Sequence, residues 1–395
     1  MMQDINVDME KMIALRQYLH AHPELSREEY ETSKYMQSYL QREAAPDEIL
    51  PLAGPGFAAI YNGETAGKTV LIRAELDALP IQEINDDLPY KSVHDGVGHK
   101  CGHDGHMTIL AGIAHLYSRK RPSSGRVVLL FQPDEETGTG ARECQTHPNF
   151  KKIEPDYTFA LHNFPGFPDN QIICTEGTFT SAVKFFAVKL QGKEAHSAMP
   201  ETGVSPALAI AEITQISQDI QKQYDKPDEY ALIVPIHINM GVSSSGVAPG
   251  YGEAHFTIRT CRNEVVDEIW NSFQNAIQKV SSKYNLTVEY EILEHFSASQ
   301  NEASAAQMVK DATTQCDFDY RHLESPFKAG EDFGEIVSRY KGAMFGLGAG
   351  EDQPQLHNPD YDFPDEIIPT GIKMFSTLVS MALEDAHHSS EKQEA

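Results

Sequence analysis

The chain of 395 residues has few cysteines and no long apolar run. Its five cysteines are odd in number and lack the spacing of a disulfide framework, which predicts a reducing compartment. No run of about 18 apolar residues occurs, so no membrane span is expected. The first residues also lack the basic stretch and apolar stretch of a secretory signal. Together these absences predict a cytoplasmic protein.

Positive charge is scarce as well. The chain has 32 Lys and Arg against 58 Asp and Glu, a formal net charge of −26. This balance argues against nucleic-acid binding, which needs a basic surface, and against adhesion to an anionic membrane. It does not exclude an anionic small-molecule substrate, because a local Arg or a bound metal can override the global field. The length favours two domains.

The densest group of metal-ligand types is the stretch KCGHDGH at residues 100–106. It places a thiol, two imidazoles and a carboxylate close together, with two glycines that let the backbone bend. A chance cluster in a surface loop is less plausible than a metal-binding role, so Cys101 and His103 are candidate ligands. Asp104 and His106 could be ligands or supporting partners. An apolar helix is expected after this stretch, at residues 107–117.

Three predicted strands, at residues 70–74, 126–131 and 157–161, each end in polar residues, with helices between them. This layout is typical of an open α/β sheet, whose sites lie at the carboxyl ends of the strands. The polar positions are Glu75 and Asp77 after the first strand, Glu135 and Glu136 after the second, and His162 after the third. A capping-box pattern at residues 26–29 predicts the start of a helix that runs to Leu40.

Glu135 and Glu136 are adjacent, so on extended backbone their side chains point opposite ways. One carboxylate could bind a metal while the other faces the substrate as a base; an ordinary acidic loop is the alternative. His162 and His357 each follow an apolar run and could be structural or ligands. One Cys, three His and one Glu are too many for a single tetrahedral zinc with an open position. They suit two metals that share a thiolate bridge and a hydrolytic water.

The pattern changes near residue 181. Strands are expected at 183–190, 231–239, 253–261 and 287–294, and helices at 204–223 and 264–282. This β-α-β-β-α-β order is that of a ferredoxin-like domain. The first pattern then resumes, so the sequence predicts a catalytic domain at 1–180 and 296–395, with a domain inserted at 181–295. In the insert, His196 is structural or an oxyanion donor, and Arg259 forms a salt bridge or binds a substrate carboxylate.

Seven stretches, in order along nearly the full length, resemble the amidohydrolase branch of the M20 metallopeptidases. They are residues 16–26, 72–81, 101–106, 132–136, 192–200, 331–333 and 356–359. That branch includes hippurate hydrolases, aminoacylase-like enzymes, indole-acetyl-amino-acid hydrolases and N-acetyl-diaminopimelate deacetylases. The resemblance implies an α/β catalytic domain with a dinuclear metal site. It also implies a ferredoxin-like α+β lid domain inserted in it, through which the chain could form a homodimer.

The resemblance also implies roles for individual residues. Metal ligands would be Cys101, His103, Glu136, His162 and His357, with Cys101 bridging two divalent ions, Mn²⁺ or Zn²⁺ in first place and Co²⁺ or Ni²⁺ as alternatives. Glu135 would be the general base, which takes a proton from metal-bound water and passes it to the leaving amine. Asp77 would support the centre. His196 would polarise the scissile carbonyl, and Arg259 would bind the substrate carboxylate.

These features predict a metal-dependent amidohydrolase that cleaves N-acetyl, N-benzoyl or related N-acyl amino acids. A dipeptidase or carboxypeptidase of the same superfamily is the alternative. A non-catalytic binding protein is a third reading, against which the intact Glu135 argues. Three positions depart from the family pattern: Glu75 replaces Asp, Gly246 lies where the lid usually carries Asn, and Gly330 where Ser is usual. None is a proposed ligand, so an active enzyme with a shifted substrate preference is expected.

Overall fold

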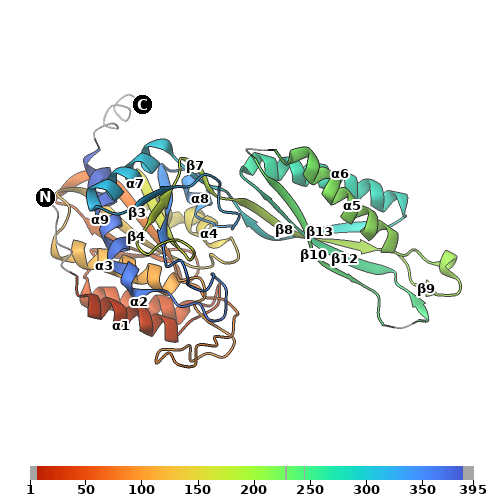
Figure 1. The fold of residues 1–395 in the computed structure, drawn as a ribbon, viewed down its shortest axis with the longest axis horizontal. Helices are drawn as coiled ribbons and strands as arrows, with labels where there is room; N and C mark the ends of the chain where they lie inside the picture. The colour runs from red at the N-terminus through yellow and green to blue at the C-terminus, as the bar shows by residue number, and fades with distance from the viewer. Residues whose placement is uncertain (1–6, 227–228, 244, 386–395) are drawn as a thin grey trace. The chain divides into compact units, whose positions relative to one another are not determined.

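The computed structural model describes residues 7–226, 229–243 and 245–385, which form two compact units (Figure 1). The larger unit contains the chain up to Phe179, Ser299–Ser325 and the chain from Asp332 onward. The smaller unit contains Thr180–Ala298 and the short segment Pro326–Glu331. Every helix in the described part of the chain is too short or too polar to cross a membrane.

An eight-stranded sheet forms the centre of the larger unit. In spatial order its strands are β1 (Glu48–Pro51), β2 (Phe57–Asn62), β4 (Ser124–Gln132), β3 (Thr65–Glu75), β5 (Tyr157–Phe164), β16 (Gly342–Gly348), β6 (Ile172–Cys174) and β15 (Tyr320–His322). The four central strands run parallel, and β1, β2 and β6 join their neighbours β2, β4 and β16 in antiparallel pairs. The predicted α/β class is confirmed, and β3, β4 and β5 contain the three strands predicted before polar residues.

Helices cover the parallel core, as its apolar strands require. The longer helices of the larger unit are α1 (Met9–Ala21), α2 (Tyr30–Glu43), α3 (His103–Arg119), α7 (Ala303–Cys316) and α9 (Ile368–Glu384); α4 (Gly140–Thr146) and α8 (Gly334–Val337) are short. One cluster of buried side chains joins α1, α3, α7 and α9 to the sheet. Residues from both ends of the chain therefore share one core.

Two helix starts differ from the sequence prediction. Helix α3 begins at His103, four positions before the predicted start, because Gly102 takes a left-handed conformation (φ +99°) just ahead of it. His103 and His106 therefore lie on the first turn of a helix, on one face. Helix α2 begins at Tyr30, and the Ser26 hydroxyl does not cap it. Instead it donates a hydrogen bond to Asp77 Oδ2 at 2.8 Å.

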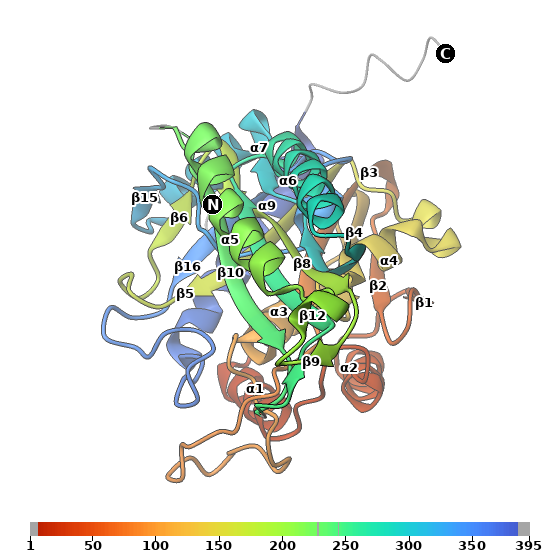
Figure 2. The same cartoon turned by 90° about the vertical axis from the view of Figure 1, so that its right-hand side faces the viewer.

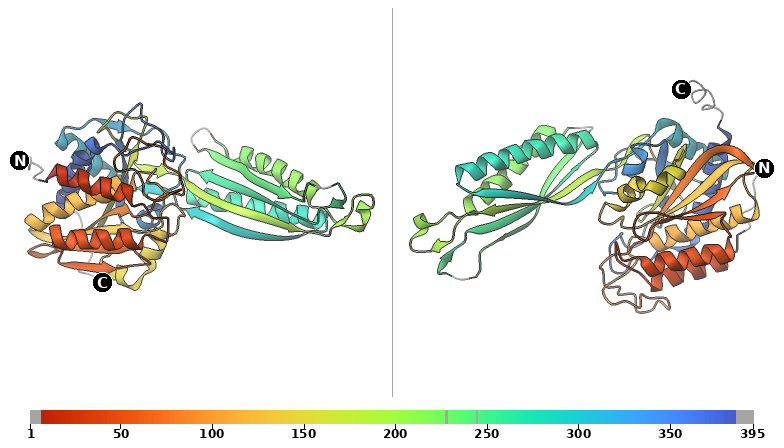
Figure 3. Two further views of the ribbon diagram at one scale, coloured as in Figure 1. Left: turned by 90° about the horizontal axis from the view of Figure 1, so that it is seen from below. Right: turned by 180° about the vertical axis from the view of Figure 1, so that it is seen from behind.

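The smaller unit has a four-stranded antiparallel sheet with two helices on one face, as Figures 2 and 3 show. Along the chain its elements are β8 (Ala182–Gln191), α5 (Ala207–Tyr224), β10 (Ala231–Met240), β12 (Tyr251–Thr260), α6 (Asn263–Lys283) and β13 (Thr287–Phe296). This is the β-α-β-β-α-β order of a ferredoxin-like domain. A separate apolar core, which includes Phe186, Phe256 and Phe273, lies between the sheet and the helices.

Candidate metal centre

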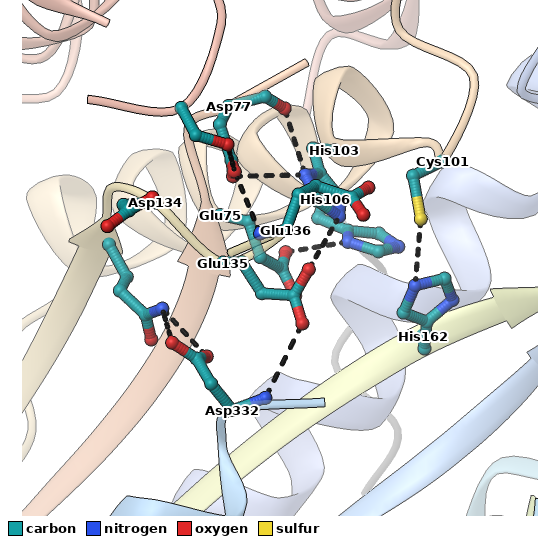
Figure 4. Close-up of polar contacts among 12 residues, drawn as sticks. Glu75, Asp77, Cys101, His103, His106, Asp134, Glu135, Glu136, His162 and Asp332 are labelled. Carbon is teal, nitrogen blue, oxygen red and sulfur yellow. Dashed lines mark hydrogen bonds and ion pairs between the residues drawn. The ribbon is translucent and has the colours of Figure 1, made fainter. Parts of the chain in front are cut away.

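The carboxyl ends of the parallel strands bring the predicted site residues of the larger unit together (Figure 4). Glu75 ends β3, Glu135 and Glu136 follow β4, and His162 lies on β5. Cys101 and His103 approach from the start of α3. His357, in the loop after β16, completes the group with its Nε2 atom 3.6 Å from Glu136 Oε1. The five predicted metal ligands thus lie in one cluster.

Cys101 lies at the overlap of two candidate ligand sets. Its donor atom lies within 4.8 Å of donor atoms of His103 and His162 in one set, and of Glu136 and His357 in the other. Cys101 Sγ lies 3.4 Å from His162 Nε2. A donor atom that belongs to two sets at once is placed as a shared ligand would be.

His103 and His162 present the same nitrogen toward the cluster. His103 Nδ1 donates to the backbone carbonyl of Asp77 at 2.9 Å, and His162 Nδ1 donates to that of Asn163 at 2.8 Å. These bonds leave Nε2 as the nitrogen of each ring that can bind a metal once it has no proton. Among the described residues, the buried Nε2 atom of His103 has no hydrogen-bond partner. A metal ion at this position would satisfy it.

The charges of the cluster also fit divalent cations. Burial, together with the carboxylates of Glu136 and Glu135, raises the pKa of the Cys101 thiol well above its ordinary value. Burial lowers the pKa of His162 to about 3, so its imidazole is neutral at neutral pH. Neutral imidazole binds a metal directly, whereas the thiol must lose its proton, which a nearby cation favours. Thiolate, imidazole and carboxylate together suit zinc and similar transition metals.

His106 supports the centre, because both of its ring nitrogens are already engaged. One contacts Glu75 Oε2 at 2.7 Å and the other Asn163 Oδ1 at 2.6 Å. Glu75 in turn forms a buried ion pair with Arg73. The longer side chain at position 75, a departure from the family pattern, thus connects Arg73 to His106.

Arg73 belongs to a buried network that sequence reasoning missed. Its guanidinium donates to Gln132 Oε1 at 2.8 Å and to Asp332 Oδ1 at 2.6 Å. The backbone N–H of Asp332 donates to Glu135 Oε1 at 3.4 Å. The network therefore reaches the predicted base. In the sequence, the one sign of this network is that Arg73 interrupts the apolar run of a predicted strand.

Sequence reasoning also missed a second buried network, which contacts Lys100 and Asp104 in the stretch at residues 100–106. His20 contacts Asp104 at 2.8 Å through Nδ1 and Glu83 at 2.9 Å through Nε2. Lys100 Nζ donates to the same Glu83 oxygen at 2.7 Å. Burial lowers the pKa of His20, but Asp104 and Glu83 outweigh it and raise that pKa to about 9. The residues on either side of Cys101 are thus held by charged partners.

Two predicted residues, His196 and Arg259, belong to the smaller unit. His196 is exposed on β9 (Ala195–His196), and its Nδ1 accepts a hydrogen bond from the Ala198 N–H at 3.1 Å. Arg259 is half-buried on β12 and donates from Nη1 to the Lys328 carbonyl at 2.7 Å. Burial lowers the pKa of Arg259.

An α/β sheet with thiol, imidazole and carboxylate donors clustered at the carboxyl ends of its strands defines a hydrolytic enzyme of the metallopeptidase type. A family model described as Peptidase family M20/M25/M40 matches residues 71–381, and the chain belongs to this family. It is therefore an amidohydrolase, a hydrolytic enzyme that acts on amides.

Curated relatives match over nearly the whole chain. An N-acetylcysteine deacetylase of Bacillus subtilis is 28% identical over 95% of this chain and 97% of its own. An N-acetyldiaminopimelate deacetylase of Lactobacillus acidophilus is 27% identical over 92% and 95%. Among solved structures, a dinuclear metal-binding peptidase of the M20 family from Bacillus subtilis is 27% identical, with a TM-score of 0.80 over 95% of this chain and 98% of that one.

The left-handed glycine before α3 gives a testable prediction about stability. A Cβ on Gly102 would lie 2.6 Å from Asn163 Oδ1, the atom that contacts His106. We expect G102A to lower the free energy of unfolding by about 2–5 kcal/mol, from backbone strain and overpacking together. Gly96 also has positive φ but open space around it, so G96A should cost only the strain, about 1–2 kcal/mol. Urea unfolding of both variants measures the difference; equal losses would contradict the packing argument.

Proposed function

We propose that this amidohydrolase cleaves the amide bond of N-acyl amino acids, with N-acetyl amino acids as the preferred class. The observation that carries the proposal is the pair of ligand sets that share Cys101, with the Glu135 carboxylate beside them. The relatives that match over more than nine-tenths of the chain are named as deacetylases of N-acetylated amino acids. Cytoplasmic location and a homodimer formed through the smaller unit remain part of the proposal.

Two divalent metal ions belong to the proposed site, Mn²⁺ or Zn²⁺ in first place. Cys101, His103, Glu136, His162 and His357 would hold them, with the thiolate shared. Support comes from the Nε2 atom of His103, which lacks a hydrogen-bond partner among the described residues, and from the overlap of the ligand sets at Cys101. Bound there, the ions would supply Lewis acidity for the scissile carbonyl and make water more acidic.

Glu135 is the proposed general base. Its carboxylate is buried, with Oε2 4.0 Å from His103 Nε2 and Oε1 receiving the Asp332 N–H. From this position Glu135 takes a proton from the attacking water and delivers it to the amine that leaves. Asp77 contributes by position: it accepts hydrogen bonds from Ser26 and from the Glu136 N–H, and its carbonyl orients His103. Asp77 therefore fixes two ligands at once.

The smaller unit supplies the remaining proposed contacts. Because the Ala198 N–H donates to His196 Nδ1, the neutral ring carries its proton on Nε2, where it can donate to a substrate carbonyl. Arg259 donates one N–H to the Lys328 carbonyl, and the other N–H groups of its planar guanidinium can donate to a carboxylate. His196 would polarise the scissile carbonyl and Arg259 would bind the carboxylate of the amino acid.

Hydrolysis of a substrate panel tests this function against its alternative. The panel contains N-acetyl amino acids, N-benzoyl amino acids and free dipeptides, and metal content is measured on the same protein sample. We expect N-acetyl amino acids to have a kcat/KM at least about tenfold above that of dipeptides, a discrimination that pocket contacts can supply. Preferred hydrolysis of dipeptides would instead support the dipeptidase or carboxypeptidase reading. Cleavage of neither class would contradict the proposal.

A further inference from the structure

The sheet of the smaller unit carries two histidines and a glutamate on the face opposite α5 and α6. His255 alternates with Ala254 and Phe256, which pack toward the helices, so its side chain points to the other face. Glu253 lies two residues before it on β12, on the same face. His237 of β10 is the cross-strand partner of His255. Side chains at such positions have Cβ atoms about 4.5–5.5 Å apart across the strands, close enough to share a ligand.

A β-bulge in β10 creates this pairing. Pro235 pairs with Phe256, yet His237 pairs with His255, so Ile236 is an extra residue without a partner in the ladder. Without the bulge, Ile236 would face His255. Bulges of this kind redirect side chains, and here the bulge places an imidazole opposite an imidazole.

Each of the two histidines has one ring nitrogen near the Glu253 carboxylate. His237 Nε2 and His255 Nε2 each lie 3.7 Å from the same oxygen, Glu253 Oε1. The two rings are 5.0 Å apart between centroids. Four ligands about 2.0–2.1 Å from a tetrahedral zinc are separated by about 3.3 Å, so small side-chain rotations complete the arrangement. His237 has half of its side chain exposed, which gives an ion access and the ring room to turn.

Two further observations point to a ligand. In the described part of the chain, the buried Nε2 atom of His255 has no hydrogen-bond partner. The other carboxylate oxygen of Glu253, Oε2, accepts a hydrogen bond from the Tyr251 hydroxyl at 2.8 Å. That bond orients Oε1 toward the two histidines, as the outer partners of metal-binding carboxylates do.

We propose that His237, Glu253 and His255 form a binding site for a divalent transition metal, Zn²⁺ in first place. Two imidazoles and one carboxylate are a donor set that zinc accepts, with the fourth position left to water. The net charge of −26 favours cation uptake. The site shares no residue with the cluster at Cys101, so it does not depend on the proposed function. Metal bound here ties β10 to β12 beyond the bulge.

Zinc stoichiometry in the full-length holoprotein tests the proposal. Wild type, H237Q and H255Q are equilibrated with buffered micromolar free Zn²⁺, and bound zinc per chain is measured by elemental analysis. H322Q is the matched control, because His322 is an exposed histidine on β15 of the larger unit. We expect wild type and H322Q to bind one ion more than H237Q and H255Q. At the site formed by His237, Glu253 and His255, H237Q and H255Q should bind Zn²⁺ at least about tenfold more weakly than wild type does. Loss of a hydrogen-bond partner of a metal ligand already weakens metal binding by about that factor.

A chemical readout on the wild-type protein removes the dependence on variant folding. Diethyl pyrocarbonate modifies accessible histidines, and mass spectrometry locates the modified residues. We expect Zn²⁺ to protect the half-exposed His237, while His322 is modified to the same extent with and without the metal. Equal zinc content and affinity in wild type and H255Q, or modification of His237 that zinc leaves unchanged, would overturn the site.

Discussion

Replacement of Glu135 by glutamine is expected to lower kcat about 10²- to 10⁴-fold while both metal ions stay bound. The amide has nearly the shape of the carboxylate, so the contact with the Asp332 N–H can persist. An amide cannot take up the proton of the attacking water, so the chemical step loses its base. Steady-state kinetics with an N-acetyl amino acid, together with metal analysis of the same sample, measures both parts of the prediction.

Two further variants separate the role of Glu135 from general effects of removing a charge. E143Q removes an exposed carboxylate on α4 of the same unit and should leave kcat unchanged. E136Q removes a proposed ligand, so it should lose bound metal, which E135Q should not. A kcat for E135Q equal to that of wild type would eliminate Glu135 as the base. Loss of metal from E135Q would instead make it a ligand.

Local sequence patterns predicted the strands that carry the site, because each is a short, mainly apolar run that ends in polar residues. Parallel strands β3, β4 and β5 then bring those ends to one edge. The start of α3 could not be predicted in the same way. Asp104 and Gly105 in the first turn have low helix propensity, and contacts of His103 with Asp77 and of His106 with Glu75 stabilise that turn behind the left-handed Gly102. Tertiary contacts decide this helix start.

The distinction between ligand and support also required three-dimensional contacts. Cys101, His103 and His106 lie in one short stretch, and all three are metal-ligand types. Only the hydrogen bonds to Glu75 and Asn163 assign His106 to support. The contact between Arg73 and Asp332 joins positions that are 259 residues apart in sequence, which no local pattern encodes. A single sequence therefore predicts which side chains meet at the edge of a sheet. It predicts less well the buried hydrogen-bond networks that hold those side chains in place.

Replacement of Cys101 by alanine is expected to remove both metal ions and to lower kcat/KM by about 10³-fold or more. Metal ions contribute several kcal/mol of transition-state stabilisation, and each 1.36 kcal/mol is a factor of ten in rate. Both metal ions should be lost because the thiol belongs to two candidate ligand sets. One set contains His103 and His162, and the other contains Glu136 and His357. Elemental analysis after dialysis against metal-free buffer, followed by kinetics, measures the effect.

C144A provides the matched control. Cys144 is a buried free thiol on α4 of the same unit, and burial raises its pKa as it does that of Cys101. Among the described residues it belongs to none of the candidate metal-ligand groups. C144A should lower the free energy of unfolding, but it should retain both metal ions. If C101A retains two ions and wild-type kinetics, the thiol is not a ligand. If C101A loses one ion and keeps the other, Cys101 serves a single ion, and the shared position would have to belong to another donor, such as a carboxylate or water.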